Sequence, residues 1–444
     1  MKRFVTITLF LISCSIVLGQ DQNFDKKKLD SLLTYIDVNR KGMHSISIFE
    51  NGKEVYQNSI GFADVSNKIM ANGQTKYRIG SISKTFTAVL IMKLIENGKL
   101  DLTTKLSDFF PSIQNSDKIT IEHLLRHRSG IFNFTNAKDY SSWMEKPISH
   151  EALIEKIKEN GIVFEPDSKA EYSNSNYVLL SQISEKVTQK KFADLIQDVI
   201  CKPCGLNSTG YGGKIDPKRN EALSYKWSGN WELASETDMS VPAGAGAITS
   251  TPTELNKFLT CLFGNHILPE PTLETMMKIV DGYGIGMFQV PFHEKKGYGH
   301  TGGIDGFQSN AFFFPKEKMS IAFTGNGQIM SMNNILIGAL SVYFNKEYKF
   351  PEFKEVFILE ADDLNTYLGT YGSPSFPLKI KIFKKKNILY GQATGQSEFP
   401  MDALGEHQFR FEPAGLKITF APNENTLVLY QGGGEFKLQK EGEN

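Results

Sequence analysis

The sequence predicts an α+β fold: an antiparallel sheet flanked by helices with an inserted helical subdomain, followed by a small C-terminal all-β barrel. Two observations carry this prediction. Strand patterns at residues 45–56 give way to helical patterns, and strand patterns return only from about residue 283. Such an order suits a sheet closed by segments that are distant in the chain. Beyond Pro351, six short alternating segments with Gly or Asn turns between them predict the barrel.

The chain begins with a helix and a hairpin. Apolar residues recur at helical spacing within residues 25–38, which predicts an amphipathic helix. Residues 45–49 alternate like a strand, and Asn51-Gly52 is a strong hairpin signal before the next strand. We therefore expect a helix and then two antiparallel strands.

Residues 80–98 predict a buried helix with reactive side chains at its start. Ser81 and Lys84 are three positions apart, so they share one helical face. The run from Phe86 to Ile95 is apolar nearly all round, which indicates burial. A desolvated lysine loses its charge more readily and can then take a proton from a neighbouring hydroxyl. Taken alone, Ser-x-x-Lys also opens many helices as a capping or solvated pair.

The remaining elements follow from periodicity. Helical patterns occur at residues 151–160, 176–188, 251–263 and 334–343, and strand patterns occur at residues 284–290, 307–314 and 319–324. The six C-terminal strand patterns show no clustered His, Cys or carboxylate chemistry. We place a first domain at residues 20–350 and the barrel domain at residues 355–444.

Composition and the N-terminus restrict the partners and the compartment. The 444 residues carry 49 basic and 49 acidic side chains, which argues against nucleic acid or an anionic membrane as the main partner. Basic residues 2–3 and an apolar stretch to Leu18 predict a signal peptide, residues 1–19, and a periplasmic or secreted protein. Cleavage after Gly19 is favoured. The alternative is a lipid anchor on Cys14 and a membrane-anchored lipoprotein. We expect no transmembrane span in the mature chain.

Three cysteines remain beyond the predicted signal peptide. Cys201 and Cys204 have redox spacing, but no preceding strand and no second Cys or His pair supports a thioredoxin or zinc site. We expect a short disulfide between them or two incidental thiols. His266, His293 and His407 have no partners at ligand spacing, so we expect no metal and no cofactor.

Two later segments share chemistry with Ser81 and Lys84. Residues 171–177 read Glu-Tyr-Ser-Asn-Ser-Asn-Tyr before an apolar helix, and residues 299–306 read Gly-His-Thr-Gly-Gly-Ile-Asp-Gly beside a strand. With its Ser-x-x-Lys, Tyr-x-Asn and His-Thr-Gly motifs in this order, the chain resembles the penicillin-recognising serine hydrolases. Within that superfamily it resembles the branch of class C β-lactamases, DD-peptidases, D-aminopeptidases and related esterases. The resemblance covers roughly residues 25–345, and it implies a β-lactamase/transpeptidase-like sheet.

The resemblance also implies a role for each motif residue. Ser81 would attack a carbonyl carbon and form an acyl-enzyme, with Lys84 as general base or sharing that role. Tyr172 would relay protons as a phenol or phenolate, which requires a nearby cation such as Lys84 if it ionises. Asn174 would bind Lys84 and the substrate amide. Backbone N–H groups of Ser81 and Gly303 would form the oxyanion hole. Thr301 and Gly302 belong to the same strand motif as Gly303 and would line the substrate-binding side of the site.

His300 stands where the β-lactamases of this branch carry lysine. Histidine is mostly neutral at pH 7, so the departure weakens a strict β-lactamase or carboxylate-binding interpretation. His123 and His127 fall in a segment that the family pattern makes a structural support, and Asp305 and Glu294 are interpreted as solvated or turn residues. We expect an exported serine hydrolase acting on a small-molecule or peptide amide or ester. The alternatives are a β-lactamase proper and a catalytically quiet peptidoglycan- or ligand-binding protein.

Overall fold

The computed structural model describes residues 24–351 and 359–442, apart from residues 375, 386, 395–397 and 432–433. The expected signal peptide, the alternative anchor at Cys14 and the expected start of the barrel domain at residue 355 lie outside these residues. In the described part of the chain, no helix combines the length and the apolar character needed to cross a membrane.

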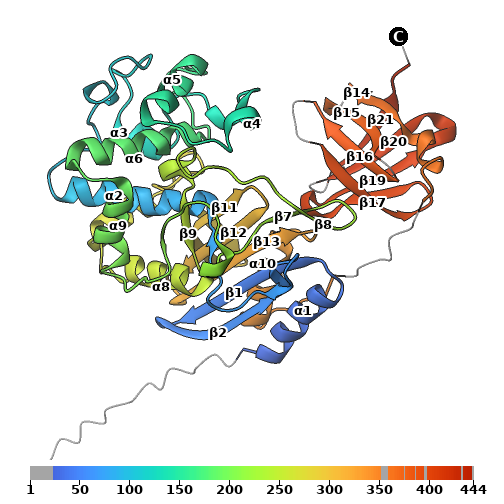
Figure 1. Ribbon diagram of the computed structural model, residues 1–444, viewed down its shortest axis with the longest axis horizontal. Coiled ribbons are helices and arrows are strands. Elements are labelled where there is room, and N and C mark those ends of the chain that lie inside the picture. Colours follow the sequence, from blue (N-terminus) through green and yellow to red (C-terminus); the bar gives the residue numbers. More distant parts are fainter. Residues whose placement is uncertain are drawn as a thin grey trace, which may run out of the picture.

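A six-stranded antiparallel sheet forms the centre of the first part of the chain (Figure 1). Its order is β10-β11-β12-β13-β1-β2, so β1 pairs with β2 next to it in the sequence and with the distant β13. This closure by distant segments confirms the predicted α+β arrangement. The strands are β1 (Gly42–Glu50), β2 (Lys53–Ile60), β10 (Phe288–Phe292), β11 (Lys295–Ile304), β12 (Phe307–Phe314) and β13 (Met319–Gln328).

Helices cover both faces of this sheet. On one face, α1 (Lys26–Val38) and α10 (Met332–Tyr343) bury their apolar sides against strand residues that include Ile46, Ile48 and Phe323. On the other face, α8 (Pro252–Phe263) packs on the sheet, and α2 (Ser83–Glu96) and α6 (Asn174–Thr188) join it in the larger core. The remaining helices are α3 (Ile121–Leu125), α4 (Tyr140–Trp143), α5 (His150–Asn160), α7 (Phe192–Ile196) and α9 (Glu270–Met277).

Helix α2 is buried almost all round, as its apolar sequence predicts. The ring of Phe86 stacks on that of Phe258 of α8 at a centroid distance of 3.9 Å. Short strands form further small sheets: β3 (Phe62–Asp64) pairs with β4 (Ile69–Met70), and β7 (Tyr225–Trp227) pairs with β8 (Trp231–Leu233). In a third one, β9 (Ile248–Ser250) lies between β5 (Tyr77–Arg78) and β6 (Gly210–Tyr211). Because β5 ends two residues before Gly80, its pairing with β9 fixes where the helix begins.

The C-terminal strands form a closed barrel of eight strands (Figure 1). They are β14 (Gly369–Ser373), β15 (Phe376–Lys385), β16 (Ile388–Ala393), β17 (Phe399–Gly405), β18 (Gln408–Phe411), β19 (Leu416–Ala421), β20 (Thr426–Gln431) and β21 (Gly434–Lys440). The barrel confirms the predicted all-β class, and six of its strands match the alternating segments. The two others, β14 and β17, contain Gly or Pro, which weaken a strand pattern in the sequence.

The cysteine pairing differs from the expectation. Cys204 forms a disulfide with Cys261, and Cys201 is free and buried. Residues 197–201 continue α7 as a wider π-helical turn, so Cys201 faces the core, where its Sγ donates a hydrogen bond to the Thr209 carbonyl. Cys204 instead lies against α8, with a Cα–Cα distance of 5.7 Å to Cys261. Both expected alternatives are therefore wrong: Cys201 and Cys204 neither bridge each other nor both remain thiols.

Candidate active site

Ser81 lies in a short 3-10 turn, Gly80–Ile82, that leads directly into α2. Gly80 has φ +50°, and a Cβ at this position would come within 2.7 Å of the backbone nitrogen of Gly303. The turn and strand β11 therefore approach each other closely, backbone to backbone. This approach brings Ser81 beside the glycines that follow His300 and Thr301.

Lys84 is fully buried, and its Nζ has three oxygen neighbours. It lies 2.9 Å from Ser81 Oγ, 2.7 Å from Asn174 Oδ1 and 2.8 Å from the Ala245 carbonyl oxygen. Burial holds the pKa of the Lys84 amine well below its usual value. A neutral amine has two N–H groups, which the Asn174 and Ala245 oxygens accept. Its lone pair then faces the Ser81 hydroxyl, and this is the arrangement a general base needs.

Asn174 is the first residue of α6, and its neighbours fix its orientation. Its backbone N–H donates to Asn133 Oδ1 at 3.0 Å, and its Nδ2 donates to Thr135 Oγ1 at 3.1 Å. With the amide nitrogen held by Thr135, the amide oxygen faces Lys84. Asn133, Thr135 and the Ala245 carbonyl were not identified as site groups from the sequence, because their contribution depends only on where they point.

Tyr172 closes the other side of Ser81. Its ring lies 4.8 Å from Lys84 Nζ and 4.5 Å from the ring of His127. Burial raises the pKa of the Tyr172 phenol far above its usual value, and a hydrogen bond with Ser81 opposes this only in part. The expected stabilisation of a phenolate by a Lys84 cation is not seen, because burial disfavours the charged form of both groups. The resting site therefore holds a neutral phenol beside the nucleophile.

The ring of His127 packs against the ring of Tyr172. Its Nδ1 accepts a hydrogen bond from the Ser173 backbone N–H at 3.1 Å, which places the ring proton on Nε2. Its ring is buried against Tyr172, Tyr177 and Tyr283, and burial lowers its pKa well below the usual value. These contacts agree with the supporting role that the resemblance implied for this segment.

Strand β11 carries the third motif past the nucleophile. The ring of His300 is buried against Phe288. Burial, and to a smaller extent repulsion by the protonated form of Lys84, lowers the pKa of His300 to about 3, so its side chain is neutral at pH 7. Its Nδ1 donates to the Thr301 carbonyl, and Thr301 itself is exposed. A Cβ on Gly302 would lie 2.0 Å from the Ile79 carbonyl oxygen. Glycine at this position permits the contact between β11 and the nucleophile turn.

A cleft of about 300 Å³ opens at this junction. It is bounded by Ser81, Asn174 and Gly303, and beyond them by aromatic, aliphatic and polar side chains that include one exposed lysine. These are Phe134, Thr135, Tyr140, Met144, Lys226, Ser235, Thr237, Pro242, Ile304 and Asp305.

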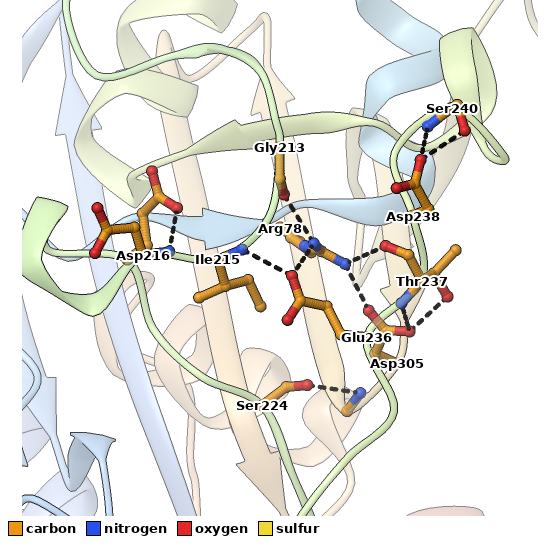
Figure 2. Close-up of polar contacts among 12 residues, drawn as sticks. Arg78, Gly213, Ile215, Asp216, Ser224, Glu236, Thr237, Asp238, Ser240 and Asp305 are labelled. Carbon is orange, nitrogen blue, oxygen red and sulfur yellow. Dashed lines mark hydrogen bonds and ion pairs between the residues drawn. The ribbon is translucent and has the colours of Figure 1, made fainter. Parts of the chain in front are cut away.

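Asp305 is a turn residue between β11 and β12, with φ +55°, as one of its two expected alternatives has it, but its side chain is buried and not solvated. Its side chain is 1% exposed and pairs with Arg78, which is 2% exposed, at 3.0 Å (Figure 2). Asp305 Oδ1 also accepts from the backbone N–H and the hydroxyl of Thr237, and Arg78 reaches Glu236 at 2.9 Å (Figure 2). Arg78 lies just before the nucleophile turn and Asp305 just after Gly303–Ile304. The pair thus joins both sides of the site.

No group of three His, Cys, Asp or Glu side chains with metal-binding geometry occurs within the ranges that the structure describes. The groups around Ser81 are an amine, a phenol and an amide. Together with the fold, a half-buried Ser81 beside the buried Lys84, both facing a Tyr and an Asn, defines a serine hydrolase site of the penicillin-recognising class.

Comparisons with known proteins agree with this class. The profile of the Beta-lactamase family matches residues 37–336, so the chain belongs to that family and is a serine hydrolase. It is 24% identical to penicillin-binding protein 4* of Bacillus subtilis (strain 168) over 92% of this chain and 97% of that protein. It is 27% identical to the teichoic acid D-alanine hydrolase of Staphylococcus aureus over 49% of this chain and 53% of that protein.

Among solved structures, the chain is similar to D-amino acid amidase from Ochrobactrum anthropi SV3 complexed with L-phenylalanine. The TM-score is 0.66 at 24% identity, and the match covers 72% of this chain and 98% of that one. At this identity the likeness supports the fold, and it agrees with the sheet and helices described above.

Proposed function

We propose that this protein is an exported hydrolase that cleaves an amide or ester through a Ser81 acyl-enzyme. The observation that carries the proposal is the environment of Lys84. Two oxygens that can only accept hydrogen bonds occupy two directions around Nζ, and Ser81 Oγ occupies the third. Export is supported by the apolar N-terminal pattern, which lies outside the described residues.

Acylation begins with attack of Ser81 Oγ on the substrate carbonyl carbon, while the hydroxyl proton moves to Lys84 Nζ. The carbonyl oxygen becomes an oxyanion, which the backbone N–H groups of Ser81 and Gly303 would bind, each contributing about 3 kcal/mol. When the C–N or C–O bond breaks, the leaving group takes the Tyr172 phenol proton. Lys84 returns its proton to Tyr172, so a neutral phenol serves the relay in this direction.

Deacylation reverses these transfers with water. Water attacks the acyl carbon and gives a proton through Tyr172 to Lys84, and Ser81 regains a proton from Lys84 as the ester bond breaks. Asn174 Oδ1 accepts from Lys84 throughout and keeps the amine directed at Ser81. The acid product and the leaving group then depart.

The substrate class is proposed to be a D-amino acid acyl group on an amine or an alcohol. The names of two similar proteins, a D-amino acid amidase and a teichoic acid D-alanine hydrolase, share this acyl donor. His300 is neutral and therefore does not provide the permanent cation that a β-lactamase proper would carry as lysine at this position.

The test is hydrolysis of matched D- and L-alanyl 4-nitroanilides and methyl esters by the full chain. We expect turnover of the D compounds to be lost in Ser81→Ala and kept in Ser83→Ala. Ser83 is the control because its hydroxyl accepts a hydrogen bond from the Ile248 N–H. Equal turnover of D and L forms would contradict the substrate class. Binding of the D compounds with no covalent intermediate would favour the alternative of a catalytically quiet binding protein.

A further inference from the structure

A second cavity, of about 460 Å³, adjoins the catalytic cleft. The two share Lys226 and the backbone strip Gly303–Asp305, which forms a wall of both. Ser81 lies on one side of this strip, and the barrel lies on the other. The two cavities therefore lie against the same three residues, one next to Ser81 and the other next to the barrel.

Both parts of the chain build the second cavity. The first part contributes β7 and residues 303–308, and the barrel contributes β17 and β18. The hairpin β7–β8 reaches the barrel (Figure 1): the Ser228 and Tyr390 hydroxyls lie 3.1 Å apart, and a Cβ on Gly229 would meet Ile388 at 3.4 Å. The barrel is thus held beside the catalytic cleft, with aromatic side chains lining the space between them. These are Tyr225, Trp227, Phe307 and Phe411.

The carboxylates around this space have cationic neighbours. Asp305 pairs with Arg78, Glu412 with Arg410 at 3.3 Å, and Glu398 with Lys385. Burial raises the pKa of the Asp402 carboxyl, and the charges of Lys41 and Arg410 oppose this shift. These cations offset the negative charge that would otherwise repel an anion.

Lys226 differs from the other charged side chains of these walls. The residue is exposed and lines both cavities, and its side chain has no hydrogen bond or ion pair with any residue that the structure describes. Glu232 lies opposite it in the β7–β8 register without an ion pair. The ammonium is therefore available at the point where the two cavities meet.

We propose that the space between the barrel and the catalytic cleft is a subsite for the part of the substrate beyond the scissile bond, and that Lys226 binds an anionic group there. The group is a carboxylate or a phosphate, since either oxyanion accepts hydrogen bonds from an ammonium. This inference rests on the proposed hydrolase function. It assigns to β7 the cation that the neutral His300 does not supply.

The test measures binding to the full-length Ser81→Ala protein by calorimetry. The probes are two matched pairs: N-acetyl-D-Ala-D-Ala with its C-terminal carboxamide, and N-acetyl-D-alanyl-ethanolamine phosphate with the unphosphorylated alcohol. We expect the anionic member of one pair to bind on the order of fivefold to tenfold more tightly, with the preference falling as salt rises. The pair with the larger preference identifies carboxylate or phosphate.

Adding Lys226→Gln should remove this preference, while Lys226→Arg and the distant surface control Lys53→Gln should keep it. On the barrel side, Phe411→Ala should weaken all four probes severalfold and leave the ratio within each pair unchanged. A preference that survives Lys226→Gln, or that is absent from both pairs, overturns the proposal. Failure of the proposed function is measured separately, as the absence of Ser81 acylation in the wild type.

Discussion

The buried pair of Arg78 and Asp305 provides a quantitative prediction. Replacing Arg78 by Met leaves the Asp305 carboxylate with only the two Thr237 donors, in a position with 1% side-chain exposure. Removing one partner of a buried ion pair costs about 3–5 kcal/mol, because the other charge stays desolvated. Glu236, at 32% side-chain exposure, can return to water and adds little to that cost.

A double-mutant cycle separates this pair from its surroundings. We expect Asp305→Asn to destabilise the wild type by about 2 kcal/mol but to be neutral or stabilising beside Arg78→Met, a coupling of at least ~2 kcal/mol. Urea unfolding measures it. The exposed pair Lys169–Glu171 is the matched control, and its coupling should stay below ~0.5 kcal/mol.

The pair also joins the nucleophile turn to Gly303, so its loss should affect catalysis in protein that is still folded. We expect kcat to fall about 10- to 100-fold in Arg78→Met, with a smaller change in KM, because the oxyanion donors move relative to each other. A coupling energy equal to that of the surface control, or an unchanged kcat, would refute this reasoning.

Three further predictions follow from single groups. Lys84→Arg should slow acylation by about 10²- to 10⁴-fold, since arginine stays protonated. The acylation rate of the wild type should rise with pH and level off well below the usual lysine pKa of 10.5. A wild-type rate that rises only near pH 10.5 would contradict a desolvated base. Burial lowers the pKa of His44 to about 3, so between pH 6.5 and pH 3 the unfolded chain binds more protons than the folded one and the protein becomes less stable as the pH falls. His44→Leu should therefore recover about 2 kcal/mol of the stability lost at pH 5, measured by urea unfolding, and His293→Gln at an exposed position should not. Gly302→Ala places a Cβ 2.0 Å from the Ile79 carbonyl oxygen and should cost more than ~2 kcal/mol of stability. In Gly303→Ala the Cβ meets nothing closer than 3.9 Å, so this variant should unfold at a higher urea concentration than Gly302→Ala. Equal unfolding midpoints of the two variants would contradict the close approach at Gly302.

The nucleophile helix and the antiparallel sheet could be predicted because their signals are local. An apolar run around Ser81 and Lys84 indicates a buried helix whatever surrounds it, and the Asn51-Gly52 turn fixes the first hairpin. Tyr172 and Asn174 were predicted by their order in a known motif, and the structure brings both to Lys84.

The remaining features depend on contacts between distant residues. The Cys204–Cys261 bridge spans 57 residues, so its pairing is set by the packing of α8. The burial of Asp305 depends on Arg78, which is far away in the sequence and close only in the folded site. Lys226 lies on a three-residue strand without a motif, and the role proposed for it rests on the two cavities that it lines. Strands β14 and β17 needed barrel closure to offset their Gly and Pro content.

We propose above all that Ser81 is a nucleophile activated by Lys84. The most direct measurement is intact-mass detection of covalent labelling by a fluorophosphonate probe across pH. We expect one adduct on Ser81 in the wild type and in Ser83→Ala, none in Ser81→Ala, and strongly slowed labelling in Lys84→Arg. No adduct on the wild type at any pH, or an adduct that persists in Ser81→Ala, would contradict it.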